Sequence, residues 1–180
     1  MSKEIILILG GARSGKSLFA QHLASELGQR VLFIATARAT DDEMRRRIEL
    51  HRKARPGNWQ TVESPTGVSE TLRLHAADAD VVVLDCLTVL MSNLMESADE
   101  PDNMDALEQE VISEVGRILN EGNAILIVVS NEVGMGLVPV YPAGRTYRDL
   151  LGKANQVVAE RADRVYLMVA GIPQRLKGGG

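Results

Sequence analysis

A phosphate-binding motif follows directly after a hydrophobic segment near the start of the chain. Residues 4–9 read Glu-Ile-Ile-Leu-Ile-Leu and lead into Gly10-Gly11-Ala12-Arg13-Ser14-Gly15-Lys16-Ser17, which fits the pattern G-x-x-x-x-G-K-S. In such loops backbone N–H groups face the phosphates, the lysine contacts the β and γ oxygens, and the hydroxyl after it holds Mg²⁺. A helix expected from Leu18 adds the favourable potential of its N-terminus. The sequence therefore predicts a nucleoside triphosphate site, with Lys16 as a catalytic residue and Ser17 as a metal ligand.

The composition is that of one compact nucleotide-binding domain, residues 1–180, with a frayed tail at 176–180. At 45% hydrophobic and 24% charged residues, the chain has enough apolar surface for a core. The net charge of −4 argues against a broad nucleic-acid surface. Cys86 is the single cysteine, which excludes an intramolecular disulfide. Because we find neither a signal-peptide pattern nor an apolar segment of bilayer length, we expect a cytoplasmic protein without a membrane span.

Short apolar segments of strand length alternate with segments of helical character. Nearly continuous apolar segments are typical of strands that are buried on both faces of a parallel sheet. We therefore expect an α/β fold, a mostly parallel sheet of the phosphate-loop NTPase type with helices on both faces. The expected strands are 5–9, 31–35, 81–84, 124–129 and 165–169, with a short extra strand at 58–63. The expected helices include 41–54, 87–95, 104–119 and 145–162.

Asp85 ends the apolar segment Val81-Val82-Val83-Leu84. Phosphate-loop enzymes place a carboxylate in this way beside the Mg²⁺ that the loop hydroxyl holds. Since both groups would lie at the carboxyl edge of the sheet, the pattern favours a metal site formed by Ser17 and Asp85. The alternative is an aspartate that merely ends the strand and caps the next helix.

His51 belongs to the basic helix expected at 41–54. There it shares a face with Met44, Ile48 and Arg55, and further cations lie close by in the sequence. These cations would attract a triphosphate, and an imidazole can act as a nucleophile. Taken by itself, the position favours an ordinary surface or partly packed histidine.

A long loop rich in glycine and proline is expected after the strand at 124–129. It starts at Asn131 and continues to Arg145. Because open α/β sheets bind ligands at this edge, we consider Asn131–Arg145 a candidate for substrate contact. A plain surface loop fits the spacing nearly as well.

Three segments together resemble one enzyme family. They are the phosphate loop, then Ile34-Ala35-Thr36-Ala37 with Asp41-Asp42-Glu43-Met44 and Arg47-Ile48-Glu49-Leu50-His51-Arg52, and then Asn131-Glu132-Val133-Gly134-Met135-Gly136. In this order they are similar to the bifunctional adenosylcobinamide kinase/adenosylcobinamide-phosphate guanylyltransferases of cobalamin biosynthesis. The resemblance runs from Ile5 to about Gly171, nearly the whole chain.

The resemblance implies two activities. Members of that family phosphorylate the aminopropanol hydroxyl of adenosylcobinamide with ATP or GTP. They then transfer GMP from GTP to the resulting phosphate through a guanylyl-histidine intermediate, which gives adenosylcobinamide-GDP and pyrophosphate. The resemblance also implies a trimer with substrate sites near the subunit contacts.

By the same resemblance, His51 is the nucleophile. The nucleotide site would include, besides the phosphate loop, Thr36, Arg52, Lys53, Ala54, Arg55, Glu63 and Asp85. Family members often have Glu where this chain has Asp85, so the carboxylate here is one methylene shorter.

Two other functions fit parts of the sequence. A phosphate-loop small-molecule kinase without a covalent step needs the loop but not His51. A nucleotide-dependent switch or binding module would show slow turnover and a partner-binding surface. We expect the bifunctional enzyme, because it accounts for all three segments.

Overall fold

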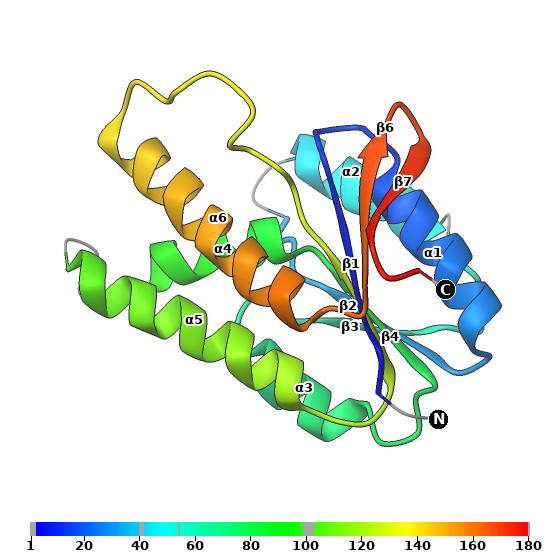
Figure 1. Cartoon of the computed structure of the whole chain (residues 1–180). Coiled ribbons are helices and arrows are strands. Elements are labelled where there is room, and N and C mark those ends of the chain that lie inside the picture. Colours follow the sequence, from blue (N-terminus) through cyan, green and yellow to red (C-terminus); the bar gives the residue numbers. More distant parts are fainter. Residues whose placement is uncertain (1–2, 40–41, 54, 99–102, 180) are drawn as a thin grey trace.

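Seven strands form one sheet in the computed structural model of the protein, in the order β3-β2-β4-β5-β1-β6-β7 (Figure 1). The structure describes residues 3–39, 42–53, 55–98 and 103–179. The strands are β1 (Ile5–Gly10), β2 (Val31–Ala35), β3 (Gln60–Glu63), β4 (Val81–Asp85), β5 (Ile125–Val129), β6 (Arg164–Val169) and β7 (Ile172–Lys177). The helices are α1 (Lys16–Leu27), α2 (Asp42–Lys53), α3 (Val68–His75), α4 (Leu87–Ser97), α5 (Met104–Asn120) and α6 (Pro142–Arg161).

The first six strands run parallel, and only β7 runs antiparallel, to β6. Their register aligns the carboxyl ends of the central strands. Ala35 at the end of β2 pairs with both Glu63 of β3 and Asp85 of β4, and Asp85 pairs in turn with Val129 of β5. Segments that leave these strand ends therefore meet at a single edge of the sheet.

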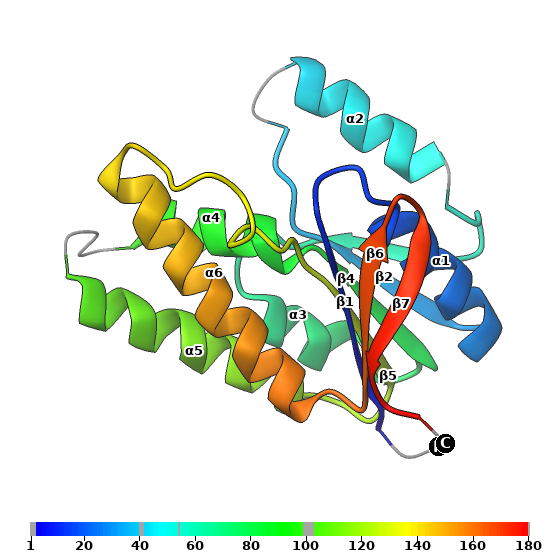
Figure 2. The ribbon, with the colours of Figure 1, turned by 45° about the horizontal axis from the view of Figure 1, so that its top comes forward.

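Helices cover both faces of the sheet, which explains why β1, β2 and β5 are buried at every position. Since successive strand residues point to opposite faces, Leu7 and Leu32 pack with the core under α3, α4, α5 and α6. Ile6, Ile8 and Phe33 pack with α1 on the other face. Figure 2 shows α5 and α6 on one side of the sheet and α1 on the other.

The α/β fold with a mostly parallel sheet and helices on both faces is confirmed. One difference concerns the C-terminus, where the sequence predicted fraying from residue 176. Leu176 and Lys177 instead belong to β7, the edge strand of the sheet, which pairs antiparallel with β6. Helix α6 begins three residues earlier than predicted, with Pro142 in its first turn, where the fixed φ of proline suits a helix. None of the described helices has the length and apolar character that crossing a bilayer requires.

Candidate active site

The phosphate loop takes the conformation that its glycines permit. Gly10 has φ of 152° and Gly15 has φ of 94°, values that side-chain-bearing residues rarely adopt. A Cβ atom at Gly10 would also lie 2.6 Å from the carbonyl oxygen of Met168. Helix α1 begins immediately afterwards and has no acidic residue in its first turn. The N–H groups at its start are therefore available to an anion.

Two other segments brace the loop from outside. The amide of Gly171, in the turn between β6 and β7, donates to the carbonyl of Ser14 over 3.0 Å. The amide of Glu132, after β5, donates to the carbonyl of Gly10 over 3.1 Å. Within the loop, the Nζ of Lys16 donates to the carbonyl of Gly11 over 2.6 Å. The loop is thus preorganised by its own residues and by two neighbouring strand connections.

Asp85 connects the phosphate loop to a pocket of about 770 Å³. Burial raises the pKa of the Asp85 carboxyl group above its ordinary value. A hydrogen bond with the side chain of Ser17 and the electrostatic effects of His51, Arg55 and Lys16 oppose that rise. One carboxylate thus contacts the loop hydroxyl and lines the pocket that holds the candidate nucleophile.

The donor set of Ser17 and Asp85 fits Mg²⁺. Both groups offer oxygen atoms, which this hard cation prefers, and Mg²⁺ usually completes its octahedron with waters and substrate phosphates. Within the described ranges, no group of three or more His, Cys, Asp or Glu side chains gathers in a way that would hold a metal. A metal here would therefore depend on ligands from the bound nucleotide.

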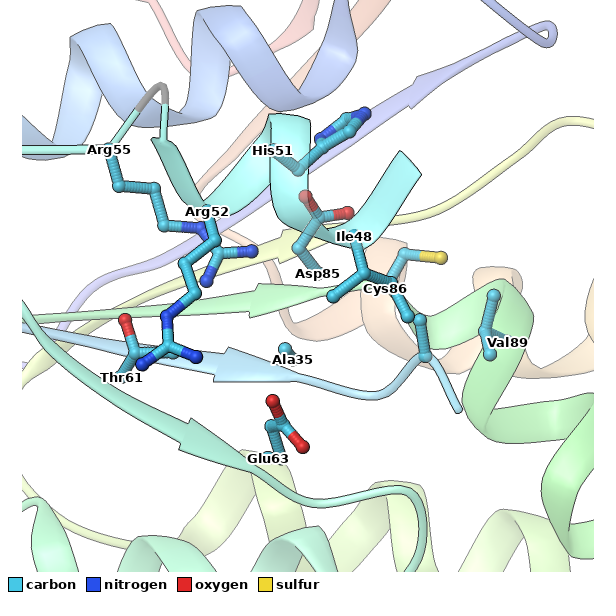
Figure 3. Close-up of a pocket in the computed structure, with 11 residues that line it drawn as sticks. Ala35, Ile48, His51, Arg52, Arg55, Thr61, Glu63, Asp85, Cys86 and Val89 are labelled. Carbon is cyan, nitrogen blue, oxygen red and sulfur yellow. The ribbon is translucent and has the colours of Figure 1, made fainter. Parts of the chain in front are cut away.

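His51 lines the same pocket from helix α2, and its side chain is half-buried. Figure 3 shows His51 on α2 and Asp85 at the end of β4, on facing elements, with Cys86 beside Asp85 and Val89 on α4. Ile48, one turn earlier on α2, shares the lining, as the helical spacing predicted. The side chain of Met44, expected on this face, is outside the described set. The structure therefore brings together His51 and Asp85, which are far apart in the sequence.

Arg55 anchors the segment after α2 to the sheet. Its guanidinium lies 3.7 Å from the centroid of the Phe33 ring, which itself stacks against Trp59. Burial lowers the pKa of Arg55, and the charges of Asp85 and Glu63 act in the opposite direction. A desolvated cation over an aromatic face is stabilised by about 2 kcal/mol. Arg55 thus provides positive charge inside the pocket and fixes the distance between α2 and β2.

Of the remaining predicted nucleotide-site residues, some line the pocket and others do not. Arg52 and Glu63 line the pocket, Arg52 from α2 and Glu63 from the end of β3 (Figure 3). Lys53 is exposed and is not part of the lining. Ala54 lies outside the described residues.

Thr36 is fully buried behind the pocket wall, although the resemblance implied that it lines the nucleotide site. Its hydroxyl donates to the carbonyl of Cys86 over 2.8 Å and accepts from the amide of Cys86 over 2.9 Å. Thr36 therefore joins the end of β2 to the residue that follows Asp85. These hydrogen bonds position the wall, and contact between Thr36 and the nucleotide stays a prediction.

Asn93 of α4 is a residue that the sequence did not single out. Its buried side-chain amide donates to the carbonyl of Thr36 over 2.9 Å and to that of Pro65 over 2.8 Å. It thereby ties together the segments that follow β2 and β3. The available sequence signal is weak, because Asn93 is one of several polar residues on the largely apolar helix 87–97.

Cys86 lines the pocket as well, but its thiol is poorly suited to chemistry. Burial, assisted by the charge of Asp85, raises its pKa to about 11.

The loop at 131–141 does not line this pocket.

Comparison with known proteins identifies the family of this chain. A family model described as cobinamide kinase/cobinamide phosphate guanyltransferase matches residues 6–176. The bifunctional adenosylcobalamin biosynthesis protein CobP of Pseudomonas aeruginosa is 46% identical over 172 residues, which cover 96% of both chains. The corresponding CobU proteins of Escherichia coli and Salmonella typhimurium are 40% and 37% identical, over 96% of this chain and 99% of theirs. The chain therefore belongs to the cobinamide kinase/cobinamide phosphate guanyltransferase family.

Proposed function

We propose that this protein catalyses both reactions that its family's description names. The first phosphorylates adenosylcobinamide with a nucleoside triphosphate, and the second transfers GMP from GTP to the product. The observation that carries this proposal is the position of Asp85, which contacts Ser17 of the phosphate loop and lines a pocket with His51. A phosphate loop and a potential nucleophile thus share one site. Since ATP and GTP are the substrates, the cytoplasm is the compartment in which we place both reactions.

In the kinase reaction, the hydroxyl oxygen of the aminopropanol arm attacks the γ-phosphorus, the bond to the β-phosphate oxygen breaks, and the hydroxyl proton is released to water. Charge neutralisation and positioning dominate the catalysis of such transfers. The loop amides and Lys16 stabilise the nucleoside diphosphate that leaves. Ser17 and Asp85 would hold Mg²⁺, which neutralises charge on the β and γ oxygens when bound.

In the transferase reaction, a ring nitrogen of His51 attacks the α-phosphorus of GTP. A P–N bond forms, the bond to the β-phosphate oxygen breaks, and pyrophosphate leaves with the support of Lys16. An oxygen of adenosylcobinamide phosphate then attacks the same phosphorus and the P–N bond breaks. The products are adenosylcobinamide-GDP and free His51. Arg52 and Arg55, on the same side of the pocket, supply positive charge for the transferred phosphate.

Glu63 makes the pocket suitable for guanine. Its carboxylate lines the wall near Thr61, on the strand next to β2. A carboxylate can accept hydrogen bonds from the N1–H and the exocyclic amine of guanine, whereas adenine presents an acceptor at N1. We therefore assign to Glu63 the preference of the transferase for GTP.

The protein also has apolar surface suited to a homo-oligomer. Ile172 and Leu176 of β7 and Val169 of β6 are exposed at one end of the sheet. A second copy would remove these side chains from water. A trimer, as the resemblance implies, would give three times the monomer mass in light scattering, and Leu176→Glu would lower that mass if this surface is the contact.

The test of the proposed function uses GTP labelled at the α-phosphate, with Mg²⁺ and no corrinoid. Label should stay on the denatured protein, be lost in acid and survive in base, as a phosphoramidate requires. His51→Ala should abolish labelling, whereas His22→Ala, at an exposed position on α1, should leave it unchanged. Absence of label in the unaltered protein, or label that persists in His51→Ala, would remove the covalent step and leave a simple kinase.

A further inference from the structure

A second large cavity lies between α4, α5 and the start of α6. It has a volume of about 1520 Å³ and a mainly apolar lining that includes Met95, Met104, Leu107, Tyr141 and Pro142. Methionine side chains are flexible and polarisable, so such a wall adapts to a ligand of irregular shape. Nothing in the kinase or transferase chemistry described above uses this groove.

The groove adjoins the nucleotide pocket along helix α4. Val89 lines the pocket, and Ser92, three residues later on the same helix, lines the groove. Three residues advance a helix by about 4.5 Å and bring the side chains to nearly the same face. The Tyr147 hydroxyl, at the groove, donates to the carbonyl of Thr88 over 3.0 Å and fixes α6 against this turn of α4. A ligand in the groove thus lies one helical turn from the pocket that contains His51.

An exposed apolar loop leads into the groove. Leu137 has 97% of its surface exposed and Val140 has 84%, while Tyr141 ends the loop and also lines the groove. Arg145 holds this end of the loop by donating to the carbonyls of Pro139 and Val140. Figure 1 shows the loop between β5 and α6 running above α4. Apolar side chains displayed together beside an apolar cavity indicate a surface that a ligand covers.

This cavity differs from two others in the edge of the sheet at which it lies. A cavity near Asp80 and Asn123 and another near Gln29 and Asn58 lie at the amino ends of the strands. A substrate bound there would be separated from the phosphate loop by the length of the sheet. The groove beside α4 lies next to the carboxyl ends, where the phosphates bind.

We propose that the groove beside α4 binds the corrin ring of the substrate, an inference that rests on the proposed function. The ring is a broad macrocycle with methyl-rich edges and amide arms. Methionine and proline side chains would cover the apolar edges, and the hydroxyls of Ser92 and Thr146 would hydrogen bond to amides. The aminopropanol arm then extends along α4, past Val89, toward the phosphates and His51.

Two substitutions inside the groove test this assignment. Ala143→Trp places a large ring in the cavity from an exposed position on α6, and Met104→Glu adds a charge to its wall. Leu74→Glu is the matched control, because Leu74 is a similarly exposed apolar residue on α3, away from the groove. For each variant we would measure the KM of the kinase for adenosylcobinamide, and its binding without nucleotide by equilibrium dialysis.

Both groove variants should raise KM and the dissociation constant for adenosylcobinamide about tenfold or more. Labelling of His51 by GTP should remain unchanged, and Leu74→Glu should behave as the unaltered protein. An unchanged KM and dissociation constant would overturn the assignment. A fall in molecular mass by light scattering, together with unchanged binding per folded monomer, would also overturn it and show an interface between copies. Because dialysis needs no turnover, its result stands even if the covalent histidine step fails its own test.

Discussion

The phosphate loop and helix α2 serve the same site but are held in different ways. The loop follows a fully buried strand, takes its shape from glycines, and is braced by amides from Glu132 and Gly171. Helix α2 projects from the body of the protein, and most of its described side chains are exposed (Figure 2). Its main described attachments are the half-buried Ile48 and His51 and the contact between Arg55 and Phe33.

This difference matches the demands of the two reactions. A phosphate loop must present several amides in a fixed arrangement, so a preorganised backbone serves both reactions. His51, the proposed nucleophile, would be required only in the guanylyl transfer, and it lies on the element with fewer described attachments. Substitutions in the two regions separate what the sheet edge contributes from what α2 contributes.

The largest effects are expected from Lys16→Ala and His51→Ala compared side by side. Lys16→Ala should lower kcat of both reactions by about 100- to 1,000-fold, because its charge stabilises the leaving phosphates in each. His51→Ala should abolish guanylyl transfer and retain the kinase reaction. Separate assays with γ-labelled ATP and α-labelled GTP would measure this. Equal losses of both reactions in His51→Ala would mean that α2 also serves the kinase step.

Asp85→Asn should reduce both activities about 100-fold while stabilising the nucleotide-free protein. Because burial holds the pKa of Asp85 above 3.8, the ionised carboxylate disfavours the folded state at neutral pH. The free energy of unfolding therefore falls as pH rises through and above 3.8, and levels off above the folded pKa. Removing the charge should therefore raise the free energy of unfolding at neutral pH.

Thermal melts of both proteins across this pH range would measure the effect. Asp85→Asn should be more stable than the unaltered protein at neutral pH, and this difference should vanish below pH 3.8. A variant that is less stable at neutral pH would show that the ionised carboxylate stabilises the sheet edge through its contacts with Ser17 and the nearby cations.

Asn93→Leu tests the hydrogen bonds that the Asn93 side chain makes behind the pocket wall. It leaves the carbonyls of Thr36 and Pro65 without their described side-chain donor, which should lower the free energy of unfolding by about 1–3 kcal/mol. If these hydrogen bonds position Glu63 and Asp85, the KM for GTP should also rise, by about tenfold. Thr36→Val should act similarly and Thr36→Ser should restore KM, because serine keeps the hydroxyl. Loss of stability with an unchanged KM would limit these residues to a structural role.

The smallest effect is expected from Asp80→Asn, at the opposite edge of the sheet. Hydrogen bonds from Arg30 and Gln29 lower the pKa of Asp80 to about 2. The contribution of this carboxylate to the free energy of unfolding is therefore present above pH 3.8 and is lost as the pH falls toward 2. The variant should lack this part of the acid dependence and keep both activities. A loss of activity would contradict the separation of the two edges.

Local patterns were sufficient to predict most of the fold. Apolar segments such as 31–35 are buried on both faces and coincide with strands, because parallel pairing leaves no polar face. The boundaries at Pro142 and Lys177 were less accurate for physical reasons. The fixed φ of Pro142 lets α6 start within a loop-like sequence, and β7 is fully exposed, so it has no apolar alternation to reveal it.

The candidate site was predicted only in part. Sequence spacing identified Ser17 and Asp85 as neighbours, since both follow strands that end at one edge. The residue pattern alone could not identify His51 as the nucleophile, because one half-buried histidine on a basic helix is not distinctive. The identification depends on the resemblance of the whole chain to an enzyme family. Asn93 and the buried position of Thr36 depend on long-range hydrogen bonds, which no local pattern encodes.

The central claim is that α2 supplies the nucleophile for a nucleotide bound at the phosphate loop. The most direct measurement is to incubate the protein with Mg²⁺ and GTP, digest it at basic pH, and locate the adduct by mass spectrometry. One GMP attached to His51 is expected, and none on the His51→Ala variant. A GMP on Lys16 or on another histidine, or no adduct while guanylyl transfer proceeds, would contradict it.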